Sequence, residues 1–380
     1  MSFESLGLSH HIIHSVKQLG YLKPFPIQEQ TIPVILSGKD LMGIAQTGSG
    51  KTACFVMPIL EKLQQQEVKR DRNIQVLVLV PTRELAIQID EVFRAFTGHL
   101  KREIKTMAVY GGVSINPQMK GMLGVEVLTA TPGRLLDLIH NKALSISQIQ
   151  HLVIDEADKM FQLGFEDELK QIFALLPKKK QTTLFSATLN DKISEIKNIL
   201  AIQPVVVEIA KDALDIDKID QVAYHVTAET KGPFLRYLIK ENKMNQVLVF
   251  VSSTRTADKL VEKLLKNKIR AISIHGEKSQ GSRRDHLDYF KKGDVQVLVA
   301  TDLIGRGIHI DALPVVINFE LPRSPLDYVH RIGRTGRAHD AGSAITLLTD
   351  EDMHHFGVIQ KKMGKTVEIK PTTDINLHGY

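Results

Sequence analysis

The stretch that decides the fold reads Leu41-Met42-Gly43-Ile44-Ala45-Gln46-Thr47-Gly48-Ser49-Gly50-Lys51-Thr52-Ala53-Cys54-Phe55-Val56-Met57. A short apolar run leads into a glycine-rich loop, and the loop leads into an apolar helical segment. Strand, loop and helix in this order form the context in which N–H groups at a helix N-terminus bind phosphate. The structural alternative is a glycine-rich turn that binds no ligand, and Ala45 stands where the usual pattern has its first glycine.

We expect this loop to hold the β- and γ-phosphates of a nucleotide. Gly48 and Gly50 let the backbone turn its N–H groups toward the phosphates. Lys51 adds a point charge, and the Thr52 hydroxyl can ligate Mg²⁺. The predicted nucleotide-binding residues of the loop are Ala45, Gln46, Thr47, Gly48, Ser49, Gly50, Lys51 and Thr52.

Apolar, β-branched runs recur along the chain and alternate with amphipathic helical stretches. The runs are residues 75–80, 125–129, 151–154, 182–185, 246–251, 295–300 and 315–319, and they suit strands buried on both faces. The helical stretches include residues 84–96, 256–266 and a first helix expected from Ser9 to Gly20. The alternation predicts an α/β fold with doubly wound parallel sheets.

Length and composition limit the class of protein. The chain has 380 residues, with 43% hydrophobic and 24% charged residues, which favours two globular domains over bulk disorder. Lys and Arg number 49 against 43 Asp and Glu, a net charge of +6 that is compatible with a polyanionic partner. The single cysteine, Cys54, excludes an intramolecular disulfide. We find neither a signal peptide nor a membrane span, so the expected location is the cytoplasm.

The alternation of predicted strands and helices is interrupted by a polar segment with alternating charges. We place an interdomain linker there, at residues 210–220, between an N-terminal domain of residues 1–209 and a C-terminal domain of residues 221–372. Residues 373–380 are then a short tail. The alternative is a surface loop inside one large domain.

Two adjacent acids, Asp155 and Glu156, end the apolar run 151–154. The carboxyl ends of strands border the ligand crevice of an open α/β sheet. We therefore expect Asp155 to hold Mg²⁺ and Glu156 to orient and deprotonate the attacking water. Adjacent acids alone would be a solvated turn, but the loop at Lys51 favours the catalytic interpretation.

A series of motifs in a fixed order shows what the chain resembles. They are Gln28 in a Gly-Tyr-x-x-Pro-x-x-Ile-Gln segment, 81–86, Gly111-Gly112, 131–134, Asp155-Glu156-Ala157-Asp158, 186–188, 249–254, 280–283, 300–307 and 330–337. Over nearly its whole length the chain resembles the DEAD-box ATP-dependent RNA helicases, most of all the bacterial RhlE-like branch. The resemblance implies two tandem RecA-like domains. It also implies RNA-stimulated hydrolysis of ATP, which separates short RNA duplexes or remodels RNA–protein complexes by interdomain closure.

The resemblance also implies roles for single residues around ATP. Gln28 would read the adenine edge and Tyr21 would stack on its face, although Tyr21 and Phe3 can equally be plain core aromatics. Arg334 and Arg337 would act as arginine fingers on the γ-phosphate. The predicted catalytic residues are thus Lys51, Asp155, Glu156, Arg334 and Arg337, with Thr52 and Asp155 as the Mg²⁺ ligands.

Further residues would couple ATP to RNA and bind its sugar-phosphate backbone. Asp158, Ser186 and Thr188 would link the nucleotide site to the RNA surface. The implied RNA-binding residues are Pro81, Thr82, Arg83, Gly111, Gly112, Thr131, Arg134, Arg283, Thr301 and Gly307. With 6% aromatic residues and no tryptophan, we expect binding without base readout.

The chain departs from the family pattern at two positions. His309 stands where most relatives carry the aspartate that accepts a hydrogen bond from the ATP ribose, and Phe25 stands where threonine is commoner. His309 keeps open a second hypothesis, an RNA clamp that rarely hydrolyses ATP. A third, a DNA-directed P-loop NTPase, is disfavoured by Gln28 and the Asp-Glu-Ala-Asp tetrad. The protein partners, ribosomal or RNA-decay factors, and the physiological RNA stay open.

Overall fold

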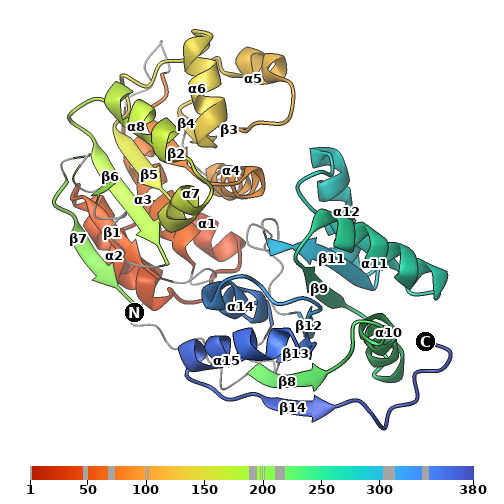
Figure 1. Ribbon diagram of the computed structural model, residues 1–380. Coiled ribbons are helices and arrows are strands. Elements are labelled where there is room, and N and C mark those ends of the chain that lie inside the picture. Colours follow the sequence, from red (N-terminus) through yellow and green to blue (C-terminus); the bar gives the residue numbers. More distant parts are fainter. Residues whose placement is uncertain are drawn as a thin grey trace. The chain divides into compact units, whose positions relative to one another are not determined.

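The computed structural model describes residues 2–45, 50–66, 73–98, 100, 102–187, 195, 196, 198, 200, 202–209, 219–302, 313–335 and 342–380. The chain forms two compact units, Met1–Lys211 and Asp212–Tyr380. Each unit contains a seven-stranded parallel sheet with helices packed against it (Figure 1). The predicted α/β class with two doubly wound sheets is confirmed.

Strands and helices alternate along unit 1. Its elements are a 3₁₀ helix η1 (Phe3–Leu6), α1 (His10–Gln18), α2 (Pro26–Leu36), β1 (Leu41–Ile44), α3 (Lys51–Gln64), β2 (Val76–Leu79), α4 (Arg83–Thr97), β3 (Thr106–Val109), α5 (Ile115–Gly121), β4 (Val127–Ala130), α6 (Pro132–His140), β5 (His151–Ile154), α7 (Ala157–Gln162), α8 (Glu166–Leu175), β6 (Gln181–Ser186) and β7 (Val205–Glu208). Every strand expected in this part of the chain is present, within two residues of its expected bounds.

Unit 2 repeats the alternation. Its elements are β8 (Ile219–His225), α10 (Lys231–Glu241), β9 (Val247–Val251), α11 (Thr254–Lys266), β10 (Ala271–Ile274), α12 (Gln280–Lys292), β11 (Val297–Thr301), β12 (Val315–Asn318), α14 (Pro325–Ile332), β13 (Gly342–Leu348), α15 (Asp352–Met363) and β14 (Glu368–Pro371). β8 begins at Ile219, so the last two residues expected in the linker belong to a strand, and residues 210–218 lie outside the described residues.

The two sheets have the same strand order. It runs β3-β4-β2-β5-β6-β1-β7 in unit 1 and β10-β11-β9-β12-β13-β8-β14 in unit 2, and subtracting seven from each label of the second sheet gives the first. The first strand of each unit is therefore inserted near one edge, beside the sixth and seventh strands. An element of one unit thus has a counterpart in the other.

Both faces of each sheet are buried, which explains the continuous apolar runs. Val76 and Val78 of β2 belong to one hydrophobic cluster, whereas Leu77 and Leu79 belong to a second. In β9, Val249 likewise packs in a cluster different from that of its neighbours along the strand. Since successive side chains of a strand point to opposite faces, the separate clusters are the two layers between sheet and helices.

The last residues of the chain pack on unit 2 rather than extending from it. Thr372 Oγ1 donates to the His225 carbonyl O at 2.7 Å, and Arg236 Nη2 donates to the Tyr380 carbonyl O at 2.8 Å. The Tyr380 ring lies edge-on to Tyr237, with centroids 5.3 Å apart, and Leu377 packs against the core. The segment expected as a tail is therefore part of the fold.

Candidate functional site

The predicted site residues of unit 1 gather at one edge of its sheet. All strands are parallel, so their carboxyl ends meet at this edge. In sheet order from β3 to β1, the residues at or just after the strand ends are Gly111 and Gly112, Thr131, Pro81, Asp155, Ser186 and Ala45. Candidate RNA-binding residues follow β3, β4 and β2, and candidate nucleotide residues follow β5, β6 and β1. The two sets therefore occupy neighbouring halves of one edge.

Lys51 begins α3 and turns its side chain back toward the end of β1. Its Nζ donates to the Ala45 carbonyl O at 3.1 Å, and 6% of the residue is exposed. Thr52, the next residue of the helix, is half-buried. Gln46, Thr47, Gly48 and Ser49 lie outside the described residues. The two flanks of the loop thus have the strand, lysine and helix that a phosphate site needs.

Gly50 joins the loop to the amino end of α2. Gln28 Nε2 donates to the Gly50 carbonyl O at 3.1 Å, and Gln28 Oε1 accepts from the Phe25 N–H at 2.9 Å. A Cβ at Gly50 would stand 2.6 Å from Gln28 Nε2 and 2.8 Å from Phe25 Cδ2, and the Gly50 φ is 83°. Both the backbone and the available space therefore require glycine. Gln28 is 0% exposed, so its amide here ties the loop to α2.

Tyr21, expected to stack on adenine, packs among aromatic side chains. Its ring centroid lies 6.3 Å from that of Phe3 in an edge-on arrangement and 5.7 Å from that of Phe96. Burial raises the pKa of the Tyr21 hydroxyl. Phe3 is 4% exposed and belongs to the core. The packing agrees with the core alternative for both residues, and the half-buried Tyr21 keeps some surface for a ligand.

The two acids after β5 are buried near the lysine of the loop. Asp155 is 3% exposed, and burial raises its pKa to about 6, while the nearby charge of Lys51 opposes the rise. Glu156 has a φ of 52°, in the left-handed region, and its N–H donates to Asp155 Oδ1 at 2.9 Å. Strained backbone of this kind occurs at functional sites. Glu156 also has a partner that the sequence analysis does not predict. Lys159 Nζ lies 2.6 Å from Glu156 Oε1, and both residues are buried.

Thr52 and Asp155 are the residues that we expect to bind Mg²⁺. Within the described ranges, no group of three or more His, Cys, Asp or Glu side chains could hold a metal ion by itself. Mg²⁺ bound with a nucleotide needs only one or two protein ligands, because phosphate oxygens and waters supply the others. A buried carboxylate whose pKa is raised by burial gains by meeting a cation, so Asp155 fits this role.

Two of the three expected coupling residues, Ser186 and Asp158, lie in the nucleotide half of the edge. Ser186 ends β6, is fully buried and accepts a hydrogen bond at its carbonyl O from the Ala45 N–H at 3.1 Å. Asp158 is buried in α7, directly after the two acids. Thr188 lies outside the described residues. Ser186 therefore connects the end of β6 to the start of the phosphate loop.

In the half of the edge that contains the candidate RNA-binding residues, two arginines contact one glycine turn. Gly112 has a φ of 74°, and a Cβ there would stand 2.0 Å from Arg83 Nη1. Arg134 is 8% exposed, and its Nη2 donates to the Val113 carbonyl O at 2.8 Å. Thr82 caps α4 by accepting from the Leu85 N–H at 3.3 Å. Arg83 and Arg134 thus both contact the turn that contains Gly112.

Unit 2 brings Thr301 to the end of β11, where it is 8% exposed, and Arg283 to α12, where it is 6% exposed. Arg334 is also buried, at 4% exposed, just beyond α14. Gly307, His309 and Arg337 lie outside the described residues.

The sequence analysis assigns no role to Arg331, yet its guanidinium donates to three described residues of unit 2. Its Nε and Nη2 donate to the two carboxylate oxygens of Asp302 at 2.5 and 2.8 Å. Its Nη1 donates to the Glu320 carbonyl O at 2.6 Å and to Asn318 Oδ1 at 3.2 Å, and the guanidinium lies 5.0 Å from the Phe250 ring centroid. Arg331 therefore fixes the chain just after β11 to α14 and to the end of β12.

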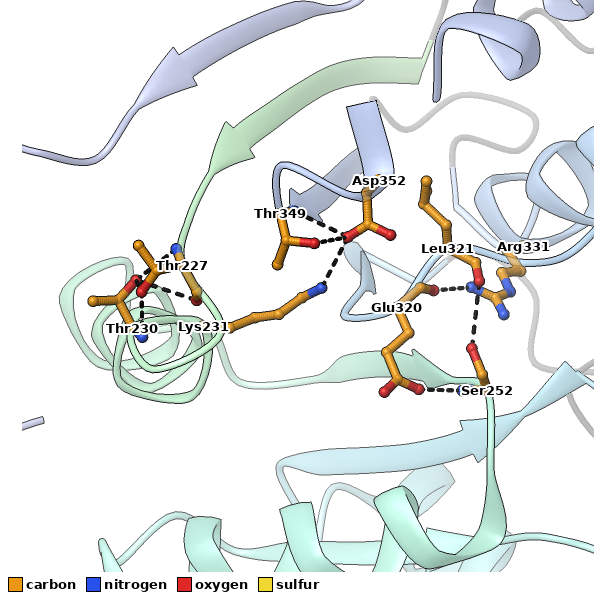
Figure 2. A network of polar contacts seen from close by, with 9 residues as sticks. All are labelled: Thr227, Thr230, Lys231, Ser252, Glu320, Leu321, Arg331, Thr349 and Asp352. Atoms are coloured by element: carbon orange, nitrogen blue, oxygen red, sulfur yellow. Dashed lines mark hydrogen bonds and ion pairs between the residues drawn. The ribbon is translucent and has the colours of Figure 1, made fainter. Parts of the chain in front are cut away.

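At the position in unit 2 that corresponds to the phosphate loop, the lysine is paired with a carboxylate of the same unit. Lys231 begins α10 as Lys51 begins α3, and β8 corresponds to β1. Lys231 Nζ lies 3.4 Å from Asp352 Oδ2, which also accepts from the N–H and hydroxyl of Thr349 at 2.9 Å each (Figure 2). Asp352 therefore neutralises this lysine within its own unit, which argues against a second phosphate site.

Comparisons with known proteins agree with this geometry. The family model "DEAD/DEAH box helicase" matches residues 25–196, and the model "Helicase conserved C-terminal domain" matches residues 230–339. The DEAD-box ATP-dependent RNA helicase CshA of Streptococcus pneumoniae is 40% identical over 375 residues, which cover 98% of this chain and 70% of CshA. The chain belongs to the DEAD-box RNA helicase family.

Other members of the DEAD-box family match over most of their length. The ATP-dependent RNA helicase RhlB of Pseudomonas putida is 36% identical over 379 residues, covering 98% of this chain and 95% of RhlB. The solved structure of Saccharomyces cerevisiae Dbp5 bound to RNA and ADP BeF3 has a TM-score of 0.85 at 30% identity, and the match covers 98% of this chain and 96% of the solved Dbp5 chain. The family prediction is confirmed, and the RhlE-like branch stays a prediction.

No helix in the described parts of the chain has both the length and the apolar character needed to cross a membrane.

Proposed function

We propose that the chain is an RNA-dependent ATPase that uses ATP to separate short RNA duplexes or to remodel RNA–protein complexes. Membership of the DEAD-box family supports both ATP and RNA as ligands. The observation that carries the proposal is the single carboxyl edge of the unit 1 sheet. Lys51, Asp155 and Glu156 are all buried in one half of it, and Arg83 and Arg134 contact the glycine turn of the other half.

The proposed chemistry is in-line attack of water on the γ-phosphate, which breaks the bond between the γ-phosphorus and the bridging oxygen and releases ADP. Lys51 would leave the Ala45 carbonyl and place its charge on the phosphates. Glu156 would orient the attacking water and accept its proton. Arg334 and Arg337 are our candidates for the groups that stabilise charge on the transferring phosphoryl in a closed state.

The metal belongs to the same proposal. Thr52 and Asp155 would hold Mg²⁺, which when bound neutralises negative charge on the phosphate oxygens. The other candidate ATP contacts are Tyr21, Gln28, Ala45, Gln46, Thr47, Gly48, Ser49, Gly50 and His309. Because Gln28 is already bonded to the loop through Gly50, we propose that its first task is to order that loop around the nucleotide.

The RNA proposal keeps to the sugar-phosphate backbone. The candidates are Pro81, Thr82, Arg83, Gly111, Gly112, Thr131, Arg134, Arg283, Thr301 and Gly307, with Asp158, Ser186 and Thr188 as coupling residues. Affinity should then fall with salt and depend little on base sequence. The solved structure of Dbp5 with RNA supports an RNA partner, and ribosomal or RNA-decay proteins, the RhlE-like branch and a cytoplasmic location remain proposals from the sequence.

ATP turnover and duplex release, measured side by side, test the proposal. The full chain should hydrolyse ATP faster with single-stranded RNA than without it, and it should release one strand of a short RNA duplex only when ATP is present. Glu156→Gln should lower turnover by about 10²-fold or more while the variant still binds ATP. The matched control is Glu168→Gln in α8, whose turnover should stay near that of the parent. Equal turnover with and without RNA would sink the proposal, and duplex release by Glu156→Gln without turnover would favour the RNA clamp.

A further inference from the structure

A network of polar contacts joins two helices that pack on opposite faces of the unit 2 sheet. Leu260 of α11 and Phe290 of α12 belong to different hydrophobic clusters, so the two helices cover different faces. Both helices contact β10, which is the outermost strand on its side of the sheet. The polar contacts pass round the carboxyl end of β10. α12, which carries the candidate RNA-binding residue Arg283, begins just after this end.

Asp258 of α11 is the centre of the network. Its Oδ1 accepts from Ser273 Oγ at 2.6 Å, and it lies 3.1 Å from His275 Nε2 and 2.9 Å from Lys278 Nζ. Ser273 and His275 are buried. Burial by itself would raise the pKa of the Asp258 carboxyl, but the bonds from Ser273, Lys278 and His275 outweigh it and hold this pKa below its usual range. The contacts therefore stabilise the charged form of Asp258.

Two of these contacts lead directly to the first turns of α12. Lys278 precedes Ser279, which caps α12 by accepting from the Ser282 N–H at 3.2 Å. Ser273 meets the same helix through its carbonyl O, which lies 2.8 Å from His286 Nδ1. The start of α12 is therefore fixed both at its cap and further along the helix.

We propose that Asp258 is a positioning residue for RNA binding, because it fixes the part of α12 that carries Arg283. The inference rests on the proposed RNA contact of Arg283 and adds the residue that sets its orientation. Arg283 lies between Ser279 and His286, the two fixed points, and its N–H donates to the Ser279 carbonyl O at 2.9 Å. Only 6% of Arg283 is exposed, so its side chain has little room to compensate for a shift of the helix. A binding group depends in this way on the residues that support it.

The exposure of the central pair favours this role over a purely stabilising one. The Asp258 and Lys278 side chains are 45% and 29% exposed, and ion pairs that reach solvent contribute little to stability. A second contact, from Thr254 Oγ1 to Glu277 Oε1 at 3.0 Å, also joins α11 to the turn before α12. Loss of Asp258 should therefore loosen this turn without unfolding unit 2.

Replacement of Asp258 separates positioning from a general effect of charge. Asp258→Ala removes a negative charge, so electrostatic attraction alone would tighten RNA binding, whereas loss of the positioning contacts would weaken it. Glu262→Ala, at an exposed position one turn later on α11, is the matched control, because it makes the same change of charge outside the network. The assay measures ATP turnover by the full chain against the concentration of single-stranded polyuridine RNA.

We expect Asp258→Ala to raise the RNA concentration that gives half-maximal turnover about five- to tenfold. Turnover at saturating RNA should stay within about twofold of the parent, because the ATP site lies elsewhere. Glu262→Ala should keep or lower the half-maximal RNA concentration. Asp258→Asn, which keeps an acceptor oxygen but not the charge, should give an intermediate value. An unchanged RNA requirement in Asp258→Ala would overturn the proposal.

A double-mutant cycle with Arg283→Ala tests whether the effect passes through Arg283. If it does, Asp258→Ala should change the RNA requirement by less than about twofold once the arginine is absent. Full additivity of the two losses would overturn the positioning role. An Arg283→Ala chain with the parent's RNA requirement would overturn the RNA contact on which the inference rests. A parent chain whose turnover RNA does not raise would contradict the proposed function itself.

Discussion

Replacing Arg331 by methionine should destabilise unit 2 strongly. The change keeps a long apolar side chain but removes a guanidinium that is 2% exposed and bonded to both oxygens of Asp302. It would leave the Asp302 carboxylate without its partner and the buried Asn318 amide and Glu320 carbonyl O without a donor. Figure 2 shows the guanidinium beside the Glu320 backbone.

The expected loss in the free energy of unfolding follows from the burial of the ion pair between Arg331 and Asp302. Breaking a buried ion pair by removing one partner costs about 3–5 kcal/mol. The Asp302 side chain is 27% exposed, so water can solvate it in part, and we expect the lower end of this range, about 3 kcal/mol. For a domain of this size, each kcal/mol lowers the melting temperature by about 2–4 °C, which gives a drop of about 6–12 °C for the unit 2 transition.

Differential scanning calorimetry and urea unfolding of the full chain would measure this effect. Arg331→Lys should recover only part of the loss, because an ammonium cannot make the paired bonds to Asp302 or stack flat on Phe250. Arg255→Met, at an exposed position of α11, is the matched control and should stay within about 0.5 kcal/mol of the parent. The double variant with Asp302→Asn should be less destabilised than the sum of its single changes. Strict additivity, or an Arg331→Met chain as stable as the control, would refute the reasoning.

Three further results are expected in unit 1. Lys159→Met should lower the free energy of unfolding by about 3 kcal/mol and reduce ATP turnover, because the buried Glu156 loses its partner at 2.6 Å. Burial lowers the pKa of His151 to about 4, below its usual 6.5. Between these two values the unfolded chain binds more protons than the folded chain does. The free energy of unfolding should therefore fall by up to about 1.4 kcal/mol per pH unit as the pH drops from 6.5 to 4. Gly112→Ala should cost about 1–2 kcal/mol and weaken RNA binding, because its φ is 74° and a guanidinium packs against it.

Each of these results has a control. Lys159→Arg should restore most of the stability and turnover, and no loss in Lys159→Met would contradict the pairing. His151→Gln should flatten the pH dependence of urea unfolding between pH 4 and 6.5, whereas an unchanged slope would assign it to other groups. Gly111→Ala is the control for Gly112→Ala in urea unfolding, since its Cβ would meet nothing within 4 Å. Equal losses in the two glycine variants would remove the packing explanation.

Much of the nucleotide half of the site could be read from the sequence because its signals are local. Lys51 lies next to its glycines, and Asp155 and Glu156 directly follow an apolar strand. Chain order and the rule that ligands bind at the carboxyl ends of strands placed all three at one edge. The pairing of Lys159 with Glu156 is not predictable from the sequence, although the two are only three residues apart, because a lysine in a helix ordinarily points to solvent.

Contacts between distant residues were harder to foresee. Tyr21 was expected at the base, but its packing on Phe96 depends on how α4 lies beside the amino-terminal segment. Phe25 departs from the family pattern in sequence, and only the tertiary structure brings its ring close to Gly50. Both depend on tertiary packing rather than on neighbouring residues.

By itself, the amino-acid sequence determined the α/β class, the alternation of strands and helices and the chemistry of the phosphate loop, because apolar periodicity and short motifs act between residues close along the chain. The tertiary structure decided that both sheets share one strand order. It also decided that Lys51 and Lys231, which begin equivalent helices, have different bonding partners. Lys51 is bonded to a backbone carbonyl, whereas Lys231 meets Asp352, 121 residues away. The physical reason is that topology, which no local pattern encodes, chooses which carboxylate stands beside each lysine.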